Sequence, residues 1–221
     1  SKEPGAFVER RAFTLARGKA VEKMREFTLR RPEQYILELV RSAVFADASW
    51  IAIDITADTV LLGFIGGKPL QKSQLDQLFD YLFVNQANLD TRHLMQLAVG
   101  VNALLQRKPS VVRIESGTGR PNETVRLDLN PNGEGSVGIV EDALAGTYVY
   151  AEGMSSRWVR FWGGGSADVE KELVETRCIY TPTPVLLNGT APFGYTSRQH
   201  VQLFGMSKQE SFQHESRRGS L

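Results

Sequence analysis

The stretch Glu38–Ile55, with the sequence ELVRSAVFADASWIAIDI, decides the fold, because a helical pattern changes there into a strand pattern. In its first half and just before it, apolar side chains recur at three- and four-residue spacing, which indicates a helix with one buried face. The members of this stripe are Tyr35, Ile36, Leu39, Val40, Ala43 and Val44. Pro32 suits the first turn of that helix. In the second half, WIAIDI alternates apolar residues with others and predicts a strand.

A hairpin and two further helices follow from the residues after this helix. The runs at 50–55 and 59–65 are rich in β-branched residues, are separated by TAD and predict a β-hairpin. Residues 73–83 predict a short amphipathic helix with Ser73 as its N-cap. Residues 90–107 predict a second long helix, because apolar residues again recur at helical spacing.

From residue 110 onward the pattern becomes one of short strands, separated by Gly, Asn and Pro. The expected strands are 110–117, 123–130, 136–142, 146–153, 157–162 and 184–189, with one helix at 163–178 and another near the start of the chain at 15–27. This order predicts an α+β fold, a two-layer sandwich whose helices pack on one face of a mostly antiparallel, mixed sheet. We expect a domain over residues 1–190, followed by a polar tail or the start of a further segment at 191–221.

The composition excludes several classes of protein. The chain has 221 residues and a net charge of +1, so no overall basic excess points to nucleic acid. Its single cysteine, Cys178, excludes an intrachain disulfide and fits a reducing compartment. No apolar run approaches the roughly 18–20 residues that span a bilayer, and the first residues lack the apolar core of a signal peptide. We therefore expect a soluble, cytoplasmic protein without membrane contact.

Several motifs within this order of elements resemble those of a known ATPase superfamily. They are ELV with a following alanine on the first long helix, a glycine-containing turn, a short helix ending in LF, a glycine in the second long helix, VVRIESG and RCIYTPTPVLLNG. Together they resemble the gyrase, chaperone, histidine-kinase and mismatch-repair (GHKL) ATPases, whose fold is called Bergerat. The likeness is greatest to the N-terminal domain of Hsp90-like heat-shock chaperones, and it covers residues 15–190.

The resemblance assigns roles to three positions of the first long helix. In the superfamily a Glu is the general base, an Asn four residues later holds magnesium, and an Asp follows three residues further on. Glu38 matches the base, whereas Ser42 and Phe45 stand where the Asn and the Asp are expected. A Ser hydroxyl is a weak magnesium ligand and a Phe is none, so the expected metal site is degraded.

The second motif of the superfamily binds adenine through an Asp and is followed by glycines. Here it corresponds to FIGGK, in which Phe64 replaces the Asp and Lys68 replaces the last glycine. Gly66 and its neighbour Gly67 remain as candidate nucleotide-contacting residues. A hydrogen bond to a charged acceptor is worth about 1.5–3 kcal/mol, so its loss weakens the binding of the base.

The third motif is a glycine-bearing turn whose backbone amides hold phosphate groups. Its counterpart is LAVGVN, which keeps Gly100 but carries Ala98 in place of another glycine. The surrounding residues predict a continuous helix over 94–105. Amides that are already bonded within a helix cannot bind phosphate.

A structural explanation stands beside each of these roles. Glu38 has Arg41 three residues away as an ion-pair partner. Phe45 and Phe64 are expected to fill core volume that a nucleotide would occupy, and Cys178 is expected to pack in the core. The loop 163–170 enters a helix as an anion-binding loop would, but it lacks the P-loop residues and suits a plain turn.

The histidines and the arginine-rich strand are explained in the same way. His93, His200 and His214 show no metal-ligand spacing and are expected at the surface, so no metal site is predicted. RWVRFW at 157–162 combines aromatic and basic residues as single-stranded nucleic-acid sites do. Alternation along a half-buried strand explains it better.

The leading hypothesis is a degenerate Hsp90-like domain that does not hydrolyse ATP. It would serve as an interaction or dimerisation module of a larger chaperone-like protein, with a protein partner or a second copy bound, and without a tightly held cofactor. The alternative is a divergent, magnesium-dependent ATPase that uses Glu38, Ser42, Gly66 and Gly100. A third hypothesis is a pocket for a more apolar small molecule. Weak binding of ATP and magnesium is compatible with the first hypothesis.

Overall fold

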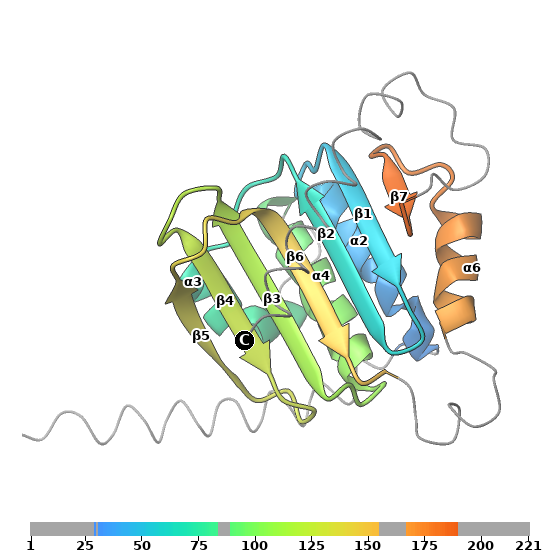
Figure 1. Cartoon of the computed structure of the whole chain (residues 1–221), viewed down its shortest axis with the longest axis horizontal. Helices are drawn as coiled ribbons and strands as arrows, with labels where there is room; N and C mark the ends of the chain where they lie inside the picture. Colours follow the sequence, from blue (N-terminus) through green and yellow to red (C-terminus); the bar gives the residue numbers. More distant parts are fainter. Residues whose placement is uncertain (1–28, 30, 84–88, 155–166, 190–221) are drawn as a thin grey trace, which may run out of the picture.

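The computed structural model describes residues 29, 31–83, 89–154 and 167–189, and it confirms the α+β fold. Over this part of the chain, seven strands form one sheet, and the helices pack together on one of its faces (Figure 1). The strands are β1 (Trp50–Ile55), β2 (Thr59–Ile65), β3 (Val111–Thr118), β4 (Thr124–Leu129), β5 (Gly135–Val140), β6 (Ala145–Glu152) and β7 (Val185–Leu187).

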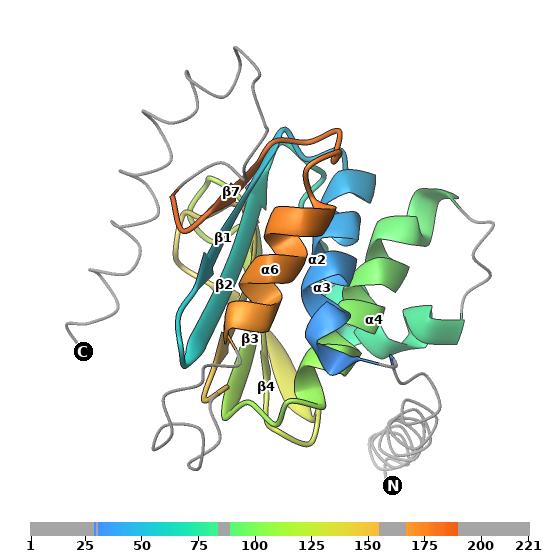
Figure 2. The ribbon, with the colours of Figure 1, turned by 90° about the vertical axis from the view of Figure 1, so that its right-hand side faces the viewer.

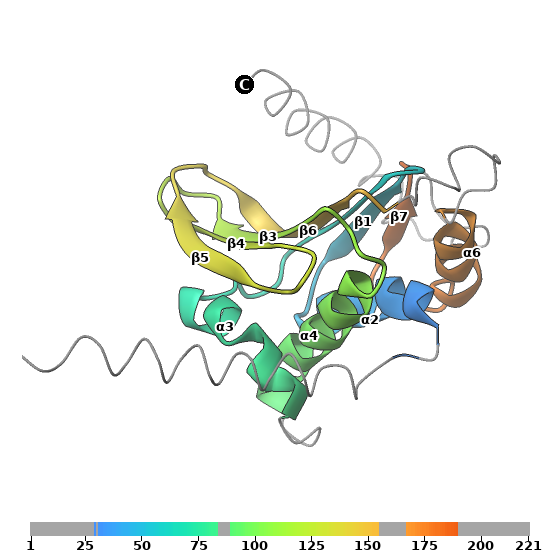
Figure 3. The ribbon, with the colours of Figure 1, turned by 90° about the horizontal axis from the view of Figure 1, so that it is seen from below.

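The α-helices are α2 (Tyr35–Phe45), α3 (Lys72–Asp76), α4 (Arg92–Leu105) and α6 (Ala167–Arg177), and the 3-10 helices are η1 (Pro32–Gln34), η2 (Leu78–Phe83) and η3 (Leu89–Thr91). Helices α2, α3 and α4 lie under the sheet, and α6 lies next to α2 at the β7 edge, as the view from below shows (Figure 3). Helix α2 lies between α4 on one side and α6 on the other (Figure 2). This central position makes α2 the element on which the candidate site depends.

The sheet has the strand order β5-β4-β3-β6-β2-β1-β7. Every neighbouring pair is antiparallel except β1 and β7, which run parallel, so the sheet is mixed as expected. Because β7 lies beside β1, α6 and the residues that connect it to β7 come next to α2. Asn188 fixes this edge, because its side-chain oxygen accepts a hydrogen bond from the Ile55 amide at 2.8 Å.

The predicted hairpin forms at the expected residues. Ile51, Ile53 and Ile55 of β1 are buried, and they alternate with more exposed neighbours, as a strand with one face on the core requires. In the turn, the Thr56 amide donates to the Thr59 carbonyl at 2.9 Å. The two threonine hydroxyls are also hydrogen-bonded, at 2.8 Å. Local pattern and turn chemistry therefore agree here, which explains why this part was predictable.

Two helical predictions need correction in detail. The helix expected over 73–83 divides into α3 and η2, and its N-cap is Gln71 rather than Ser73. The Gln71 amide donates to the Gln74 side chain at 2.8 Å, so a capping box one turn long starts the helix before the serine. The long helix expected over 90–107 is α4, with η3 forming its first residues.

The hydrophobic core lies between the sheet and the helix layer. Its largest fully buried side chains come from α2, α4 and the central strands, and include Tyr35, Ile36, Leu39, Ile51, Ile53, Leu62, Leu97, Leu104 and Ile114. In the described ranges, no helix combines the length and the apolarity that a membrane span needs. The expected helix at 15–27, the strand at 157–162 and the tail at 191–221 lie outside the described residues.

Candidate functional site

The first face of α2, toward α4, contains the position where the metal ligand was expected. The Ser42 hydroxyl donates a hydrogen bond to the backbone carbonyl of His93, at 2.8 Å. Ser42 is buried, and His93 belongs to the first turn of α4. The backbone of α4 therefore lies against α2 at the level of Ser42.

Gly100 lies in the middle of α4 and allows this close contact. A Cβ atom at Gly100 would stand 2.7 Å from Leu39 Cδ2 and 3.2 Å from the Leu39 backbone nitrogen. The first distance is shorter than real Cβ atoms show and the second is tight, so the glycine lets the two helix backbones approach. The prediction of a continuous helix around Gly100 is confirmed, since α4 extends over Arg92–Leu105.

Phe64 is a core residue, as expected. It lies on β2 opposite Ile51 of β1 and Thr147 of β6, and only 4% of it is exposed. Its ring occupies the interior of the sandwich, where it contributes to the main hydrophobic cluster. Packing in the core therefore accounts for Phe64 at the position where the resemblance predicted an adenine-binding Asp.

The prediction that Phe45 fills core volume is wrong. Phe45 is 36% exposed, and the Arg92 guanidinium lies over its ring, 4.6 Å from the centroid. The reason is helical geometry, because Phe45 follows buried Ala43 by two residues and so points to nearly the opposite side of the helix. Ala46 and Ala48 are buried in its place. Phe45 thus contributes a surface aromatic with a cation–π contact.

The glycine pair after β2 serves the connection between the hairpin and α3. Gly66 has a positive φ of 89°, and a Cβ atom there would be 2.9 Å from the Ser49 backbone nitrogen. A Cβ atom at Gly67 would be 2.5 Å from the Ala46 carbonyl oxygen. Both glycines are therefore required by the close approach of this turn to the end of α2.

Glu38, the expected general base, lies on α2 in an ion pair. Its Oε1 is 2.6 Å from Arg41 Nη1, as its spacing in the sequence predicted. Glu38 is 8% exposed, whereas the Arg41 side chain is 59% exposed. Although Glu38 and Ser42 are one turn apart, Ser42 is engaged with α4 and Glu38 with Arg41. Each of the two residues that the magnesium-ATP hypothesis assigns to one site is thus hydrogen-bonded to another group.

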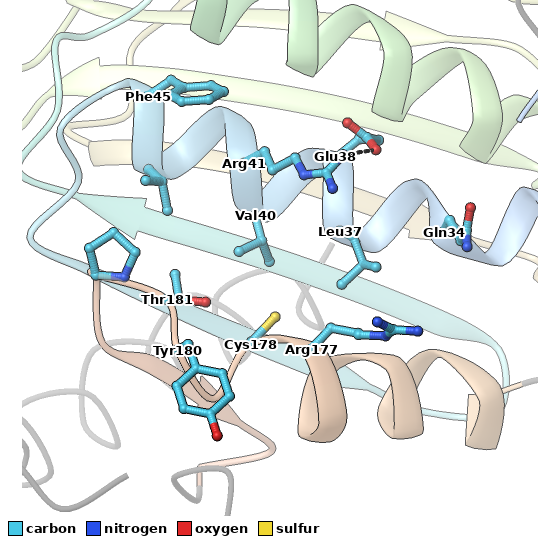
Figure 4. A pocket seen from close by; sticks show the side chains of 12 residues that line it. Gln34, Leu37, Glu38, Val40, Arg41, Phe45, Arg177, Cys178, Tyr180 and Thr181 are labelled. Carbon is cyan, nitrogen blue, oxygen red and sulfur yellow. Dashed lines mark hydrogen bonds and ion pairs between the residues drawn. The ribbon is translucent and has the colours of Figure 1, made fainter.

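The second face of α2 borders an open groove, with a volume of about 510 Å³, opposite the end of α6 (Figure 4). We call it the α2–α6 groove. It is lined by Gln34, Leu37, Glu38, Val40, Arg41, Val44 and Phe45 from α2 and its start, and by Arg177, Cys178, Tyr180, Thr181 and Pro182 from the end of α6 and the connection to β7. Leu37 and Val40 face Cys178 and Thr181 across it. Sequence reasoning missed this groove because its two walls are more than a hundred residues apart.

Cys178 packs in the core as expected and is 2% exposed. Burial raises the pKa of its thiol to about 11, against an opposing hydrogen bond with the Thr181 side chain. A thiol with so high a pKa carries almost no thiolate near neutral pH, so it is a poor nucleophile. Cys178 therefore shapes the groove without supplying chemistry to it.

A partly buried cluster of charges links α6 to the start of α2 and the end of α4. Arg107 pairs with Glu33 at 2.9 Å and with Glu170 of α6 at 3.3 Å. Glu170 Oε2 and the Tyr35 hydroxyl are both buried, and neither has a hydrogen-bond partner within the described part of the chain. Burial raises the pKa of the Glu170 carboxyl, although Arg107 opposes the shift. Two carboxylates share one guanidinium here, which makes the cluster sensitive to protonation.

His93, which was expected at the surface, is half-buried at the start of α4. Burial lowers its pKa, and the nearby Lys68 acts in the same direction, while Asp47 opposes both. Among the residues that the structure describes, no group of three or more His, Cys, Asp or Glu side chains is arranged to hold a metal ion. His200 and His214 lie outside those residues.

These residues do not fit a magnesium-bound nucleotide. The Ser42 hydroxyl already contacts the α4 backbone, Phe64 lies in the core, and the Gly100 amide belongs to a helix. Phosphate binding at Gly100 would require the helix to unwind, because its backbone donors are used within α4.

Comparison with known proteins adds no assignment. No protein-family model matches the chain, and no curated protein matches it in sequence. The described residues thus define an α+β protein in which α2 has one closed face, toward α4, and one open face, at the α2–α6 groove.

Proposed function

We propose that this chain is a degenerate GHKL-type, Hsp90-like domain that binds other proteins or a second copy and does not hydrolyse ATP. It would belong to a larger chaperone-like protein of the cytoplasm, the compartment to which its single cysteine is suited. The order of elements supports the resemblance. A long helix leads into a hairpin, a second long helix precedes antiparallel strands, and a last helix and strand follow.

The contact between Ser42 and the His93 carbonyl carries the non-hydrolysing part of the proposal. A nucleotide with its metal needs space beside Ser42, the position of the expected metal ligand. Here the backbone of α4 occupies that space at His93. Two turns further along α4, Gly100 brings the same two helices together. Opening the interface would expose buried side chains such as Leu39 and Leu97, which costs free energy in proportion to the apolar area exposed.

The α2–α6 groove supports the interaction part of the proposal. It presents two exposed aromatic residues, Phe45 and Tyr180, at 36% and 92% exposure. Aromatic and arginine side chains provide a large share of the binding energy in protein interfaces. Arg41 and Arg177 stand beside them, so the groove has the composition of an interface centre.

The test is calorimetric titration of the whole chain with magnesium-ATP, together with a phosphate-release assay. We expect no saturable micromolar binding and no phosphate release above that of the buffer. Glu38→Ala should leave both measurements unchanged, because the carboxylate is already paired with Arg41. Micromolar binding that disappears in Glu38→Ala or Ser42→Ala would instead establish the divergent ATPase and overturn the proposal.

A further inference from the structure

We propose that the α2–α6 groove binds an acidic, amphipathic helix of a partner protein. This inference rests on the proposed interaction role and names the chemistry of the partner. The groove follows α2 from Gln34 to Phe45, a length of about 17 Å at 1.5 Å per residue. A partner helix of about three turns matches that length, and helices laid into grooves are a common mode of peptide recognition.

The apolar part of the groove fits one face of such a helix. Leu37 and Val44 are half-buried and lie seven residues apart on α2, so they form a stripe along its axis. Tyr180 belongs to the opposite wall, and 92% of its surface is exposed. Apolar side chains from successive turns of a partner would cover these residues and remove their apolar surface from water.

The net charge of the groove favours a partner of the opposite charge. Three charged side chains line the groove: the guanidinium groups of Arg41 and Arg177 and the carboxylate of Glu38. The lining therefore has a net charge of +1. Arg177 is exposed and forms no ion pair with another residue that the structure describes, and Arg92 adds a cation over the Phe45 ring at one end. Carboxylates beside the apolar face of a partner would pair with these guanidinium groups.

The chain itself lacks a matching segment at its ends. Residues 1–28 carry seven Lys and Arg against four Glu, a net charge of +3, and residues 190–221 carry four against two, a net charge of +2. Either segment would bring further positive charge to a positive groove. A second copy that used the same face would place Arg41 and Arg177 of both copies close together, and like charges disfavour such a contact.

The experiment is a selection of random peptides, about 15 residues or roughly four helical turns long, displayed on phage against the immobilised whole chain. We expect enriched peptides with apolar residues at three- and four-residue spacing and with Asp or Glu beside them. Enrichment of basic or uncharged peptides, or no enrichment, would overturn the inference.

The best selected peptide is then synthesised, and its affinity is measured by fluorescence polarisation. The Arg177→Glu variant should bind this peptide at least about tenfold more weakly, as expected when a pairing charge is reversed. Arg120→Glu is the matched control, because Arg120 is also exposed but lies in the turn between β3 and β4. The affinity of the Arg120→Glu variant for the peptide should stay within about twofold of that of the unaltered chain.

Three outcomes separate this inference from the proposed function. Peptide binding that is unaffected by Arg177→Glu would reject the acidic partner at this groove while the interaction role stands. A dimer in analytical ultracentrifugation that dissociates in the Arg177→Glu variant would assign the groove to a second copy and would also overturn the inference. Hydrolysis of magnesium-ATP would instead overturn the non-hydrolysing function, whatever the peptides show. The melting temperature of each variant, measured alongside, confirms that it is folded.

Discussion

The two sides of α2 differ although they belong to the same helix. Toward α4, the helix presents Leu39, Ser42 and Ala43, which are buried. On α4, Gly100 packs closely against Leu39. Toward α6, it presents Leu37, Arg41 and Val44, and an open groove remains. Small residues allow two backbones to approach, whereas long side chains hold neighbouring elements apart.

The two neighbours of α2 are also held in different ways. Helix α4 is held by extensive apolar contact and by the Ser42 hydrogen bond. Helix α6 has a smaller contact with α2, and its buried Glu170 is tied to Arg107. The ion pair between Glu170 and Arg107 positions α6 without the large apolar contact area that closes the interface between α2 and α4. This difference explains how one helix can support a closed interface and an accessible surface together, and it can be tested residue by residue.

The largest difference is expected between two leucines on α2. Leu39→Ala should reduce the free energy of unfolding by about 2–5 kcal/mol, because it leaves a cavity at a site that is 1% exposed. Leu37→Ala should reduce it by about 1 kcal/mol or less, since Leu37 is only half-buried. Urea unfolding of both variants measures the two values, and equal losses would show that α2 has no closed and open side.

A smaller effect is expected from crowding the helix contact. Gly100→Val should cost about 1–3 kcal/mol, because the added atoms overlap Leu39. The control is Gly138→Val on the edge strand β5, where a Cβ atom meets nothing within 4 Å. Its stability should hardly change, and thermal unfolding compares the two. If Gly100→Val were as stable as the control, the close approach of α4 to α2 would be refuted.

The hydrogen bond between α2 and α4 is expected to contribute less again. Ser42→Ala should lower the free energy of unfolding by about 0.5–1.5 kcal/mol, the usual value for one hydrogen bond. Ser49→Ala removes a longer and exposed hydrogen bond to the Ile65 carbonyl, at 3.1 Å, and should cost less. The order of the two values, taken from urea unfolding midpoints, decides whether the Ser42 contact is a stabilising part of the closed face.

The smallest effect is a change in the pH dependence of stability at the α6 cluster. The folded pKa of Glu170 lies above its ordinary value of 4.5, because burial disfavours the carboxylate. Its contribution is therefore fully present below about pH 4.5 and is lost as the pH rises through the folded pKa. As the pH rises from about 4.5 through the folded pKa of Glu170, the free energy of unfolding of the unaltered chain should fall relative to that of the Glu170→Gln variant.

Unfolding midpoints at a series of pH values measure this slope. Glu172→Gln is the matched control, because Glu172 is exposed on the same helix, and it should keep the slope of the unaltered chain. An identical pH dependence in the Glu170 and Glu172 variants would contradict the raised folded pKa of Glu170.

Much of the fold followed from local patterns. The hairpin was predicted at its observed bounds, and α2 and α4 followed from their apolar periodicity, because these elements obey local spacing rules. The error at Ser73 arose because Gln71 and Gln74 form a capping box that competes with a serine cap. The error at Phe45 came from treating a superfamily position as a core position, although its direction on the helix points it to the surface.

The candidate site was less predictable. The ion pair between Glu38 and Arg41 is local and was expected, whereas the Ser42 contact with His93 joins residues far apart in the sequence. The groove depends on the return of the chain beside β1, which places Tyr180 and Arg177 opposite α2. No spacing within either segment indicates that arrangement.

The sequence by itself determined which segments become helix or strand, and which stripe of α2 is apolar, because periodicity and turn chemistry act over a few residues. Only the tertiary structure decided what covers each side of that helix. Gly100 and Ser42 become a closed interface because α4 packs there, and Arg41 and Phe45 border an open groove because α6 packs further away. Contacts between distant segments depend on the whole sheet order, which no single stretch specifies.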